Sequence, residues 1–267
     1  MNHETKQPEV LRRYSPRLAA GFAWWLRGYF RRNFDGVRVA RDGGPPEPGD
    51  GPLIVYTNHP SWWDPIHFLL LARLVLPGLR MFGPFDAAAL EKYPLFGRLG
   101  AFGVDRSSRR GAVEFLKTSR SILAAPGTTL WITAQGEFSD PRRRPVVLRS
   151  GLAHLIRALE GGLVVPLAVE YPFWNERRPV ALSRFGRPIE VGNEKGREVE
   201  DLTGWLGERL AETMDALAEE AATRDPARFR TLVLGRAGVG GVYDLGRRFR
   251  AWVRGRRFDS AHEDERR

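Results

Sequence analysis

The sequence predicts an α/β fold: a single domain with a mixed β-sheet flanked by helices, plus basic amphipathic N- and C-terminal flanks. Short apolar runs of strand length alternate with longer segments of helical periodicity, an order that is typical of α/β domains. The chain has 267 residues, of which 42% are hydrophobic, and this suffices for one substantial core. The excess of Lys and Arg lies toward the two ends of the chain.

Four strands and four helices are expected in the central part of the chain. Asp64-Pro65 is a helix-start signal, with Asp at the N-cap and Pro at the first helical position. In the second helix, Val113 is among the residues expected to face inward. The expected strands are 53–57, 129–133, 163–169 and 180–185. The expected helices run from Asp64 to Leu74 and over 110–124, 151–159 and 198–221.

The net charge of +10 is concentrated in two flanks. Residues 1–41 hold 9 Lys and Arg against 3 Asp and Glu, and residues 224–257 hold 10 against 2. Residues 42–223 are nearly neutral. Basic flanks attract polyanions, either nucleic acid or the anionic face of a membrane. We therefore expect a basic aromatic flank over 1–41, a catalytic domain over 50–222 and a second basic flank over 224–257.

Aromatic residues in both flanks favour the membrane. Trp, Phe and Leu alternate with Arg at helical spacing in residues 17–34 and again in 241–254, a pattern typical of helices that lie in a bilayer interface. The alternative is an ordinary amphipathic helix packed on the domain. No apolar run approaches the roughly 20 residues that span a bilayer, and no signal peptide is evident. With no cysteine in the chain, we expect a peripheral or monotopic protein at the cytoplasmic face of the cell membrane.

The most specific feature is the segment Asn-His-Pro-Ser-Trp-Trp-Asp-Pro at residues 58–65. It places His59 just after a buried strand and Asp64 at the start of a helix. The carboxylate can then accept from one ring nitrogen, which leaves the other nitrogen free as a general base. This is the His–Asp half of a triad without a serine; in acyl transfer the attacking oxygen can come from the substrate. The alternative is a surface histidine beside a helix cap, because His-x4-Asp arises by chance in many proteins.

Three further blocks follow in order. They are Phe-Gly-Val-Asp-Arg at 102–106, Trp-Ile-Thr-Ala-Gln-Gly-Glu at 131–137 and Val-Val-Pro-Leu-Ala at 164–168. Together with His59 and Asp64, they resemble the four ordered motifs of the glycerophospholipid (lysophospholipid) acyltransferase family, and the chain looks like a 1-acylglycerol-3-phosphate acyltransferase with a divergent third motif. The resemblance covers residues 50–215.

The resemblance implies a membrane-associated acyltransferase of lipid metabolism and phospholipid biosynthesis. It implies that the domain over 50–222 carries a tunnel or groove for the acyl chain. The acyl group would move from acyl-CoA or acyl-carrier protein to the hydroxyl of a lysophospholipid, 1-acylglycerol-3-phosphate. His59 would be the base, held by Asp64, and Arg106 would bind the phosphate of the acceptor. The thioester is a substrate, so no cofactor is expected, and no metal site is expected because no His, Asp and Glu cluster has metal-ligand spacing.

The third block departs from the family pattern. Gln135 stands where the family has Glu, before Gly136, and Glu137-Phe138-Ser139 replaces Thr-Arg-Ser. We expect Gln135, Gly136 and Glu137 to bind substrate, with Glu137 able to supply the lost charge. The acceptor therefore stays open, and the alternative is a lipid without glycerophosphate, such as a glycosylated or amino-acid lipid.

Two other classes of protein are weaker alternatives. A nucleic-acid-binding protein would suit the basic flanks, but the neutral middle and the lack of a nucleic-acid motif argue against it. An inactive lipid-binding relative would have no need to keep His59, Asp64 and Arg106 together. The expected partners are an anionic membrane surface, a lipid acceptor and an acyl thioester, and no nucleic acid. His67 and His154 are expected to have structural roles.

Overall fold

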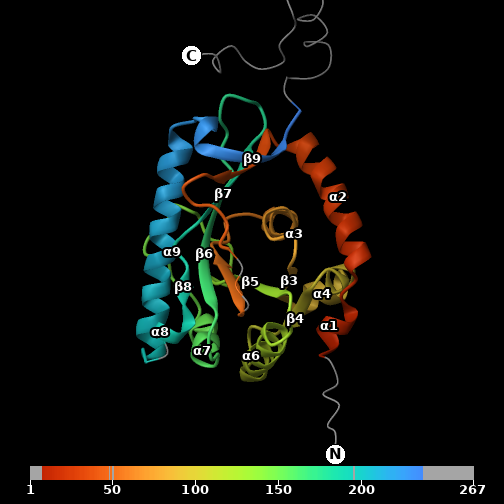
Figure 1. The fold of residues 1–267 in the computed structure, drawn as a ribbon, viewed down its shortest axis with the longest axis vertical. Helices are drawn as coiled ribbons and strands as arrows, with labels where there is room; N and C mark the ends of the chain where they lie inside the picture. The colour runs from red at the N-terminus through yellow and green to blue at the C-terminus, as the bar shows by residue number, and fades with distance from the viewer. Residues whose placement is uncertain (1–7, 48, 50, 195, 237–267) are drawn as a thin grey trace, which may run out of the picture.

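The computed structural model describes residues 8–47, 49, 51–194 and 196–236, and it confirms an α/β fold with a mixed sheet flanked by helices (Figure 1). The strands are β1 Gly36–Ala40, β2 Leu53–Thr57, β3 Arg80–Asp86, β4 Ala101–Val104, β5 Thr128–Thr133, β6 Leu163–Glu170, β7 Val180–Phe185, β8 Ile189–Glu190 and β9 Phe229–Leu234. Their order is β4-β3-β5-β2-β6-β7-β1-β9, with β8 paired to β6. The run from β4 to β6 is parallel, whereas β7 is antiparallel to β6 and β9 to β1.

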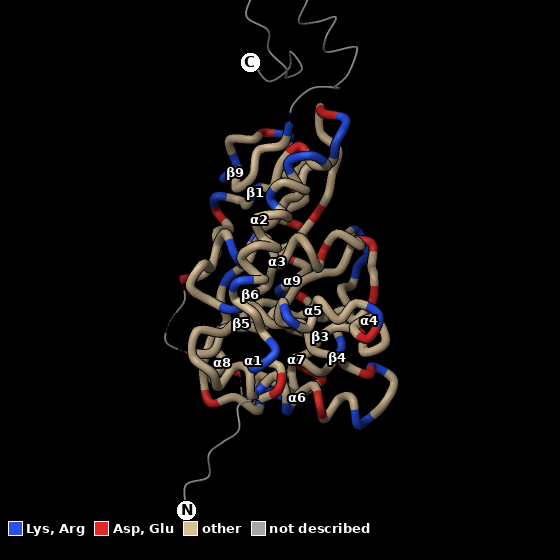
Figure 2. The backbone as a smooth tube through the Cα atoms, turned by 90° about the vertical axis from the view of Figure 1, so that its right-hand side faces the viewer, with Lys and Arg blue, Asp and Glu red and all other residues tan. Residues whose placement is uncertain are grey.

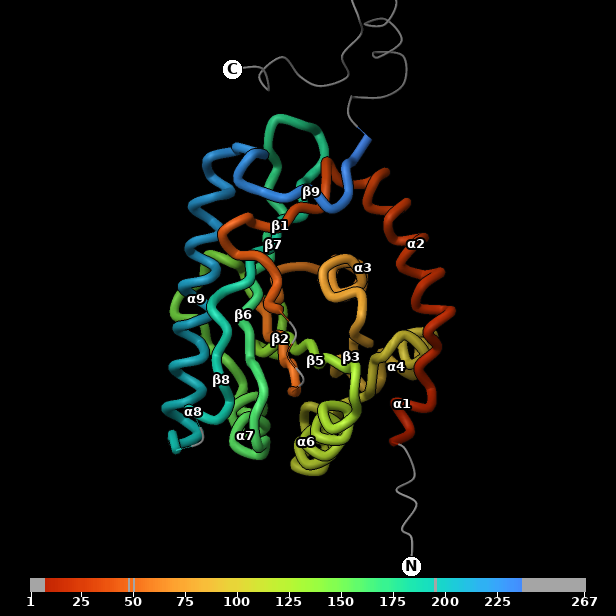
Figure 3. Tube along the Cα trace, in the orientation of Figure 1, coloured from red at the N-terminus to blue at the C-terminus, as the bar shows by residue number. Residues whose placement is uncertain are grey.

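Helices cover both faces of the sheet. They are α1 Glu9–Arg13, α2 Pro16–Asn33, α3 Asp64–Val75, α4 Ala87–Lys92, α5 Leu95–Arg98, α6 Arg109–Leu123, α7 Gly151–Arg157, α8 Val191–Glu194 and α9 Val199–Ala222, with a 3₁₀ turn η1 at Pro226–Arg228. Successive side chains of β2 point to opposite faces of the sheet and join two different cores. Ile54 and Tyr56 join the core formed with α6, α7 and α9, while Leu53 and Val55 join the core under α3. Helix α2 lies outside α3 (Figure 3).

Helix α2 belongs to the predicted N-terminal flank and packs on the domain along one face. The Ser15 hydroxyl caps its first turn, where Pro16 fits without the loss of a hydrogen bond. Leu26, Phe30 and Phe34 are fully buried in a cluster shared with α3. The opposite face is exposed and includes Trp24. The flank is therefore a packed amphipathic helix whose outer face stays open to other contacts.

The sheet extends beyond residues 50–222, the range expected for the domain. Strand β1 comes from the segment 1–41, and β9 comes from the segment 224–257. Residues 237–257 of the second predicted flank lie outside the described residues. Among the helices that the structure describes, none is both long and apolar enough to cross a membrane.

Two local expectations were wrong. Asp64 is the first residue of α3 rather than its cap, and its carboxylate turns back toward the preceding loop instead of bonding the first helical amides. Val113 is exposed, because the buried face of α6 runs through Gly111, Phe115 and Ser119, and a residue two positions from Phe115 lies on the far side of a helix with 3.6 residues per turn.

Candidate active site

The candidate site lies at one edge of the sheet, where the parallel strands end, and it combines predicted residues with others that the sequence did not single out. His59 follows β2, Gln135 follows β5, Arg106 follows β4, Asp86 ends β3 and Tyr171 follows β6. Parallel strands bring their carboxyl ends to the same edge, and open α/β sheets bind their ligands there. Residues far apart in the sequence therefore share one site.

His59 and Asp64 form the hydrogen bond that their spacing predicts. Nδ1 of His59 lies 2.7 Å from Oδ2 of Asp64, which also accepts from the backbone N–H of Ser61 at 3.1 Å. The Asp64 side chain is fully buried, whereas that of His59 is 16% exposed. The carboxylate fixes the proton of His59 on Nδ1, so Nε2 carries a lone pair. A histidine held in this way can accept a proton from a hydroxyl group.

The third block supports His59 directly. Thr57 of β2 pairs with Thr133 of β5, so two residues later His59 lies beside Gln135. The backbone N–H of His59 donates to Oε1 of Gln135 at 3.0 Å, and the carbonyl of His59 accepts from Ser139 N–H, also at 3.0 Å. Both polar groups of the His59 backbone are thus tied to this block. Gln135, which the sequence predicts to bind substrate, holds the backbone of the candidate base through its side-chain oxygen.

Phe138 covers one face of the His59 ring. The two ring centroids are 4.3 Å apart, and Phe138 is 60% exposed. In the family pattern an arginine stands at this position, so the surface beside His59 is apolar where a cation would be usual.

Arg106 lies against the same block. Its Nη1 donates to the carbonyl of Gly136, and its Nη2 lies 3.4 Å from Oδ2 of Asp86. Gly136 has φ of +74°, and a Cβ added there would lie 2.4 Å from Nε of Arg149, so only glycine suits the position. Arg106 and Arg149 therefore both reach Gly136. Half of the Arg106 side chain is exposed, so its guanidinium is open to a ligand.

A rigid turn holds Arg106 in place. Hydrogen bonds to its carboxylate lower the pKa of Asp105 to about 2, and the bond from Ser107 contributes more than the bond from Ser108. Ser108 also caps α6 by accepting from the N–H of Gly111 at 3.0 Å. A Cβ at Gly111 would lie 1.8 Å from the carbonyl oxygen of Asp105, so the turn can approach the helix only because residue 111 is glycine.

Glu137 follows Gly136 in the same block. It is exposed, and it makes no hydrogen bond or ion pair with the rest of the described chain. His59, Asp64, Arg106, Gln135 and Gly136 are linked to one another through hydrogen bonds or adjacent backbone.

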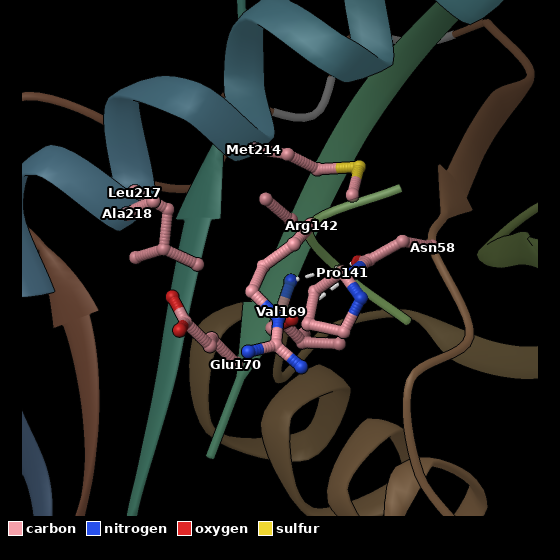
Figure 4. Close-up of a pocket in the computed structure, with 9 residues that line it drawn as sticks. Asn58, Pro141, Arg142, Val169, Glu170, Met214, Leu217 and Ala218 are labelled. Carbon is pink, nitrogen blue, oxygen red and sulfur yellow. Dashed lines mark hydrogen bonds between the residues drawn. The ribbon is translucent and has the colours of Figure 1, made fainter. Parts of the chain in front are cut away.

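A small cavity lies between Asn58 and α9 (Figure 4). Its volume is about 30 Å³, enough for about one water molecule and too small for an acyl chain. Asn58 borders it and bonds the backbone of Val169 in both directions, at 3.0 and 2.9 Å. Arg142 also lines it, beside Glu170, whose pKa burial raises. A larger crevice lies at the opposite edge of the sheet, around Gly51 and Gly162. Neither is the acyl-chain tunnel expected from the family.

The sequence did not single out several residues that touch this site, Tyr171 and Asn58 among them. The Tyr171 hydroxyl donates to Oδ1 of Asp64 at 2.7 Å, and the two hydrogen bonds of Asn58 fix the strand end that carries His59. The available signal was positional. Tyr171 lies two residues after the expected strand 163–169, and the ends of parallel strands meet at one edge.

Comparisons with known proteins agree with this geometry. A family model described as Acyltransferase matches residues 31–170. The crystal structure of the 1-acyl-sn-glycerophosphate (LPA) acyltransferase PlsC from Thermotoga maritima is similar in fold, with a TM-score of 0.50 and 15% sequence identity over 80% of this chain and 84% of that chain. No curated protein matched the sequence. The family match spans the segments that contain His59, Arg106, Gln135 and Pro166, and it covers more than half of the chain. The chain is an enzyme of the acyltransferase family.

Proposed function

We propose that this acyltransferase moves a fatty acyl group from an acyl thioester, acyl-CoA or acyl-carrier protein, to the hydroxyl of a lysophospholipid, with 1-acylglycerol-3-phosphate as the acceptor. The observation that carries the proposal is the 2.7 Å contact between His59 Nδ1 and the buried Asp64 carboxylate. It supports an imidazole that Asp64 holds through Nδ1, which leaves Nε2 to act as the base.

The reaction needs one base and no covalent enzyme intermediate. Nε2 of His59 takes the proton of the acceptor hydroxyl while its oxygen attacks the thioester carbonyl carbon. The new C–O bond forms, the tetrahedral intermediate collapses and the C–S bond breaks. The proton on Nε2 then passes to the departing sulfur, which leaves as a free thiol, and His59 is again neutral. Asp64 stabilises the imidazolium in between.

Two guanidinium groups support a phosphate-bearing acceptor. Arg106 and Arg149 both lie against Gly136, and Gln135 next to it bonds His59. Guanidinium groups bind phosphate oxygens through paired, charge-assisted hydrogen bonds. Asp86 neutralises part of the Arg106 charge at 3.4 Å, and both groups are about half exposed. A phosphate can displace this weak surface pair.

The outer face of α2 supports membrane association. Arg17, Trp24, Arg27 and Arg31 are exposed and recur at spacings of three, four or seven residues, so they form one stripe along the helix. Trp24 is 80% exposed. Figure 2 views the molecule from this side and marks Lys and Arg in blue. A tryptophan between arginines suits the headgroup region of an anionic membrane, and we place the protein at the cytoplasmic face of the cell membrane.

Phe138 favours a second candidate acceptor. It lies on the His59 ring where the family pattern has arginine, and Glu137 beside it is exposed and acidic. An apolar ring and a carboxylate next to the base would suit the hydroxyl of an uncharged glycosylated lipid, or an amino-acid lipid, better than a second phosphate contact.

The test is an acyl-transfer assay with labelled acyl-CoA or acyl-carrier protein. Purified protein is offered lysophosphatidic acid, a glycolipid and an amino-acid lipid as separate acceptors, and each acylated product is identified by mass. Acylation of lysophosphatidic acid at the highest kcat/KM supports the first candidate. Preference for another acceptor supports the second, and no product from any acceptor contradicts both.

A further inference from the structure

A second histidine, His67, lies behind the catalytic pair. It is on α3, one turn after Asp64, and is fully buried. Its Nδ1 lies 3.0 Å from the Tyr171 hydroxyl oxygen, and its Nε2 lies 3.3 Å from the Ser183 hydroxyl oxygen. Because Tyr171 also touches Asp64, an unbroken set of polar contacts runs from Ser183 on β7 to the candidate base.

The protons in this set can be placed by counting donors. Asp64 is the acceptor at both of its oxygen atoms: Oδ2 contacts His59 Nδ1 and accepts from the Ser61 N–H, and Oδ1 accepts from the Tyr171 hydroxyl. The 2.7 Å contact at Oδ1 therefore uses the single proton of the Tyr171 hydroxyl. Burial, with the nearby Asp64 charge, holds the pKa of Tyr171 well above its ordinary value, so this proton stays on the phenol.

His67 then has only one possible tautomer. With its proton given to Asp64, the Tyr171 oxygen can only accept from His67, so Nδ1 of His67 carries hydrogen. Burial lowers the pKa of His67 to about 3, so the ring is neutral and Nε2 is an acceptor. Ser183 must donate to it. The opposite tautomer would leave two oxygen atoms 2.7 Å apart with no hydrogen between them.

The surroundings make these bonds strong. Phe30 and Phe34 lie over the rings of His67 and Tyr171, with centroids 5.7 and 6.1 Å apart respectively. Both phenylalanines are fully buried. Hydrogen bonds in such a water-poor environment are electrostatically stronger than in water, and an unpaired polar group there is costly.

We infer that Ser183, His67 and Tyr171 form a one-directional hydrogen-bond chain in which every proton points toward Asp64, and that Tyr171 is a positioning residue for the His59–Asp64 pair. The chain keeps one carboxylate oxygen occupied by Tyr171, so the other stays aimed at Nδ1 of His59. The effect on acyl transfer rests on the proposed function, whereas the proton positions do not.

The proton positions can be measured in the unmodified protein. Long-range ¹H–¹⁵N spectra with ¹⁵N-histidine distinguish the two neutral tautomers, and His67→Gln assigns the His67 signals. We expect the Nδ1–H tautomer for His67, unchanged from pH 5 to 8. An Nε2–H tautomer, or titration in this range, would overturn the chain even if the enzyme is active.

Kinetics test the positioning role. Tyr171→Phe removes only the donor to Asp64, and we expect kcat to fall about tenfold with KM for both substrates within about twofold. Tyr56→Phe is the matched control, because its buried hydroxyl bonds the Leu206 carbonyl at 3.1 Å, outside this chain. The control should keep kcat within about twofold. Equal kcat in Tyr171→Phe and the unmodified protein would refute the role.

A second pair of variants covers a failure of Tyr171→Phe to fold. His67→Gln can still donate to Tyr171 and accept from Ser183, whereas His67→Leu can do neither. We expect His67→Gln to keep at least about five times the kcat of His67→Leu. Equal activities would contradict the chain. If the unmodified protein acylates no acceptor while His67 shows the Nδ1–H tautomer, the proposed function fails and the inferred hydrogen-bond chain is still supported.

Discussion

The backbone N–H of His59 donates to the side-chain oxygen of Gln135, 76 residues further along the chain, at 3.0 Å. Gln135 stands where the family pattern has glutamate, and either side chain offers an oxygen for this hydrogen bond. The glutamine therefore preserves the support of His59 and removes the charge that glutamate would place beside it. The candidate base and the altered motif form one unit, and several predictions depend on this.

The catalytic pair gives the first prediction. We expect His59→Ala to lower kcat by about three orders of magnitude, because no other described base lies at this position. Asp64→Asn should lose about two orders, since the base survives but its tautomer and orientation suffer. Exposed His154 on α7 provides the control, and His154→Ala should leave kcat unchanged. Circular dichroism checks folding. Normal turnover in folded His59→Ala would refute the mechanism.

The central strands and the catalytic pair were predictable from sequence because their signals are local. Strands β2, β5, β6 and β7 are short apolar runs, and His59 and Asp64 lie five residues apart. The other strands carry weaker signals. Gly83 and Pro84 interrupt the apolar sequence pattern of β3. Glycine is required at position 83 because a Cβ there would lie 2.8 Å from the Trp131 carbonyl oxygen.

Strand β1 and the deeper part of the site depend on distant partners. Arg38 lies in the middle of β1 and is buried, and it pairs with Asp35 at 2.9 Å. A charged residue within the segment interrupts the apolar run by which a buried strand is usually predicted. Tyr171 and His67 are 104 residues apart and meet only after the sheet has formed. Sequence spacing carries no information about such contacts, whereas strand order does.

Phosphate recognition gives the second prediction. Arg106→Ala should raise KM for lysophosphatidic acid about tenfold and leave KM for the acyl donor within about twofold, because a charge-assisted pair to phosphate is lost. Arg149→Ala should act in the same direction. Arg73 on α3 donates to the backbone carbonyl of Pro77 and serves as the control. Equal increases in both KM values would assign Arg106 a structural role.

Buried His67 gives the third prediction, which concerns pH and stability. Burial lowers its pKa from 6.5 to about 3 in the folded protein, so the unfolded chain binds the proton first as pH falls. The stability contributed by neutral His67 is therefore complete above pH 6.5 and is lost progressively below it. Between pH 7 and 5 the loss is about 2 kcal/mol.

The control for this effect is His67→Gln, which keeps hydrogen bonds but cannot titrate. Urea unfolding of both proteins at pH 7 and pH 5 gives the comparison. Between pH 7 and pH 5, the free energy of unfolding should fall by about 2 kcal/mol more in the unmodified protein than in the variant. Parallel losses would show that His67 is not buried as a neutral group.

The stripe on α2 gives the fourth prediction. Binding to vesicles should strengthen with anionic lipid and weaken with salt, because screened charges contribute part of the attraction. Trp24→Ala should weaken binding at low salt as well, since apolar insertion contributes the rest. Trp25→Ala is less specific, because Trp25 stacks between Phe22 and Tyr29 at 5.4 and 5.5 Å.

Exposed Val113 on α6 is the control for an apolar surface residue outside the stripe. Val113→Ala should bind vesicles like the unmodified protein. If Trp24→Ala also binds normally, while deletion of residues 237–257 releases the protein, the membrane contact belongs to the second flank instead.

The last prediction concerns Gln135 itself. Gln135→Leu removes the acceptor for the His59 N–H, so we expect kcat to fall at least about tenfold with every acceptor, because a partly buried amide is left unpaired beside the base. Gln135→Glu keeps this hydrogen bond at nearly constant volume, so kcat should survive. The added negative charge lies near Gly136, where Arg106 bonds, and its effect should depend on the acceptor.

If the acceptor carries a phosphate, the kcat/KM ratio of lysophosphatidic acid to a glycolipid should favour lysophosphatidic acid in the unmodified protein. Glu137→Ala should then change this ratio by less than about twofold, because Glu137 is exposed and forms no hydrogen bond or ion pair with the described chain. A ratio that favours the glycolipid, and that moves toward lysophosphatidic acid in Gln135→Glu, would show instead that the altered third block selects the acceptor.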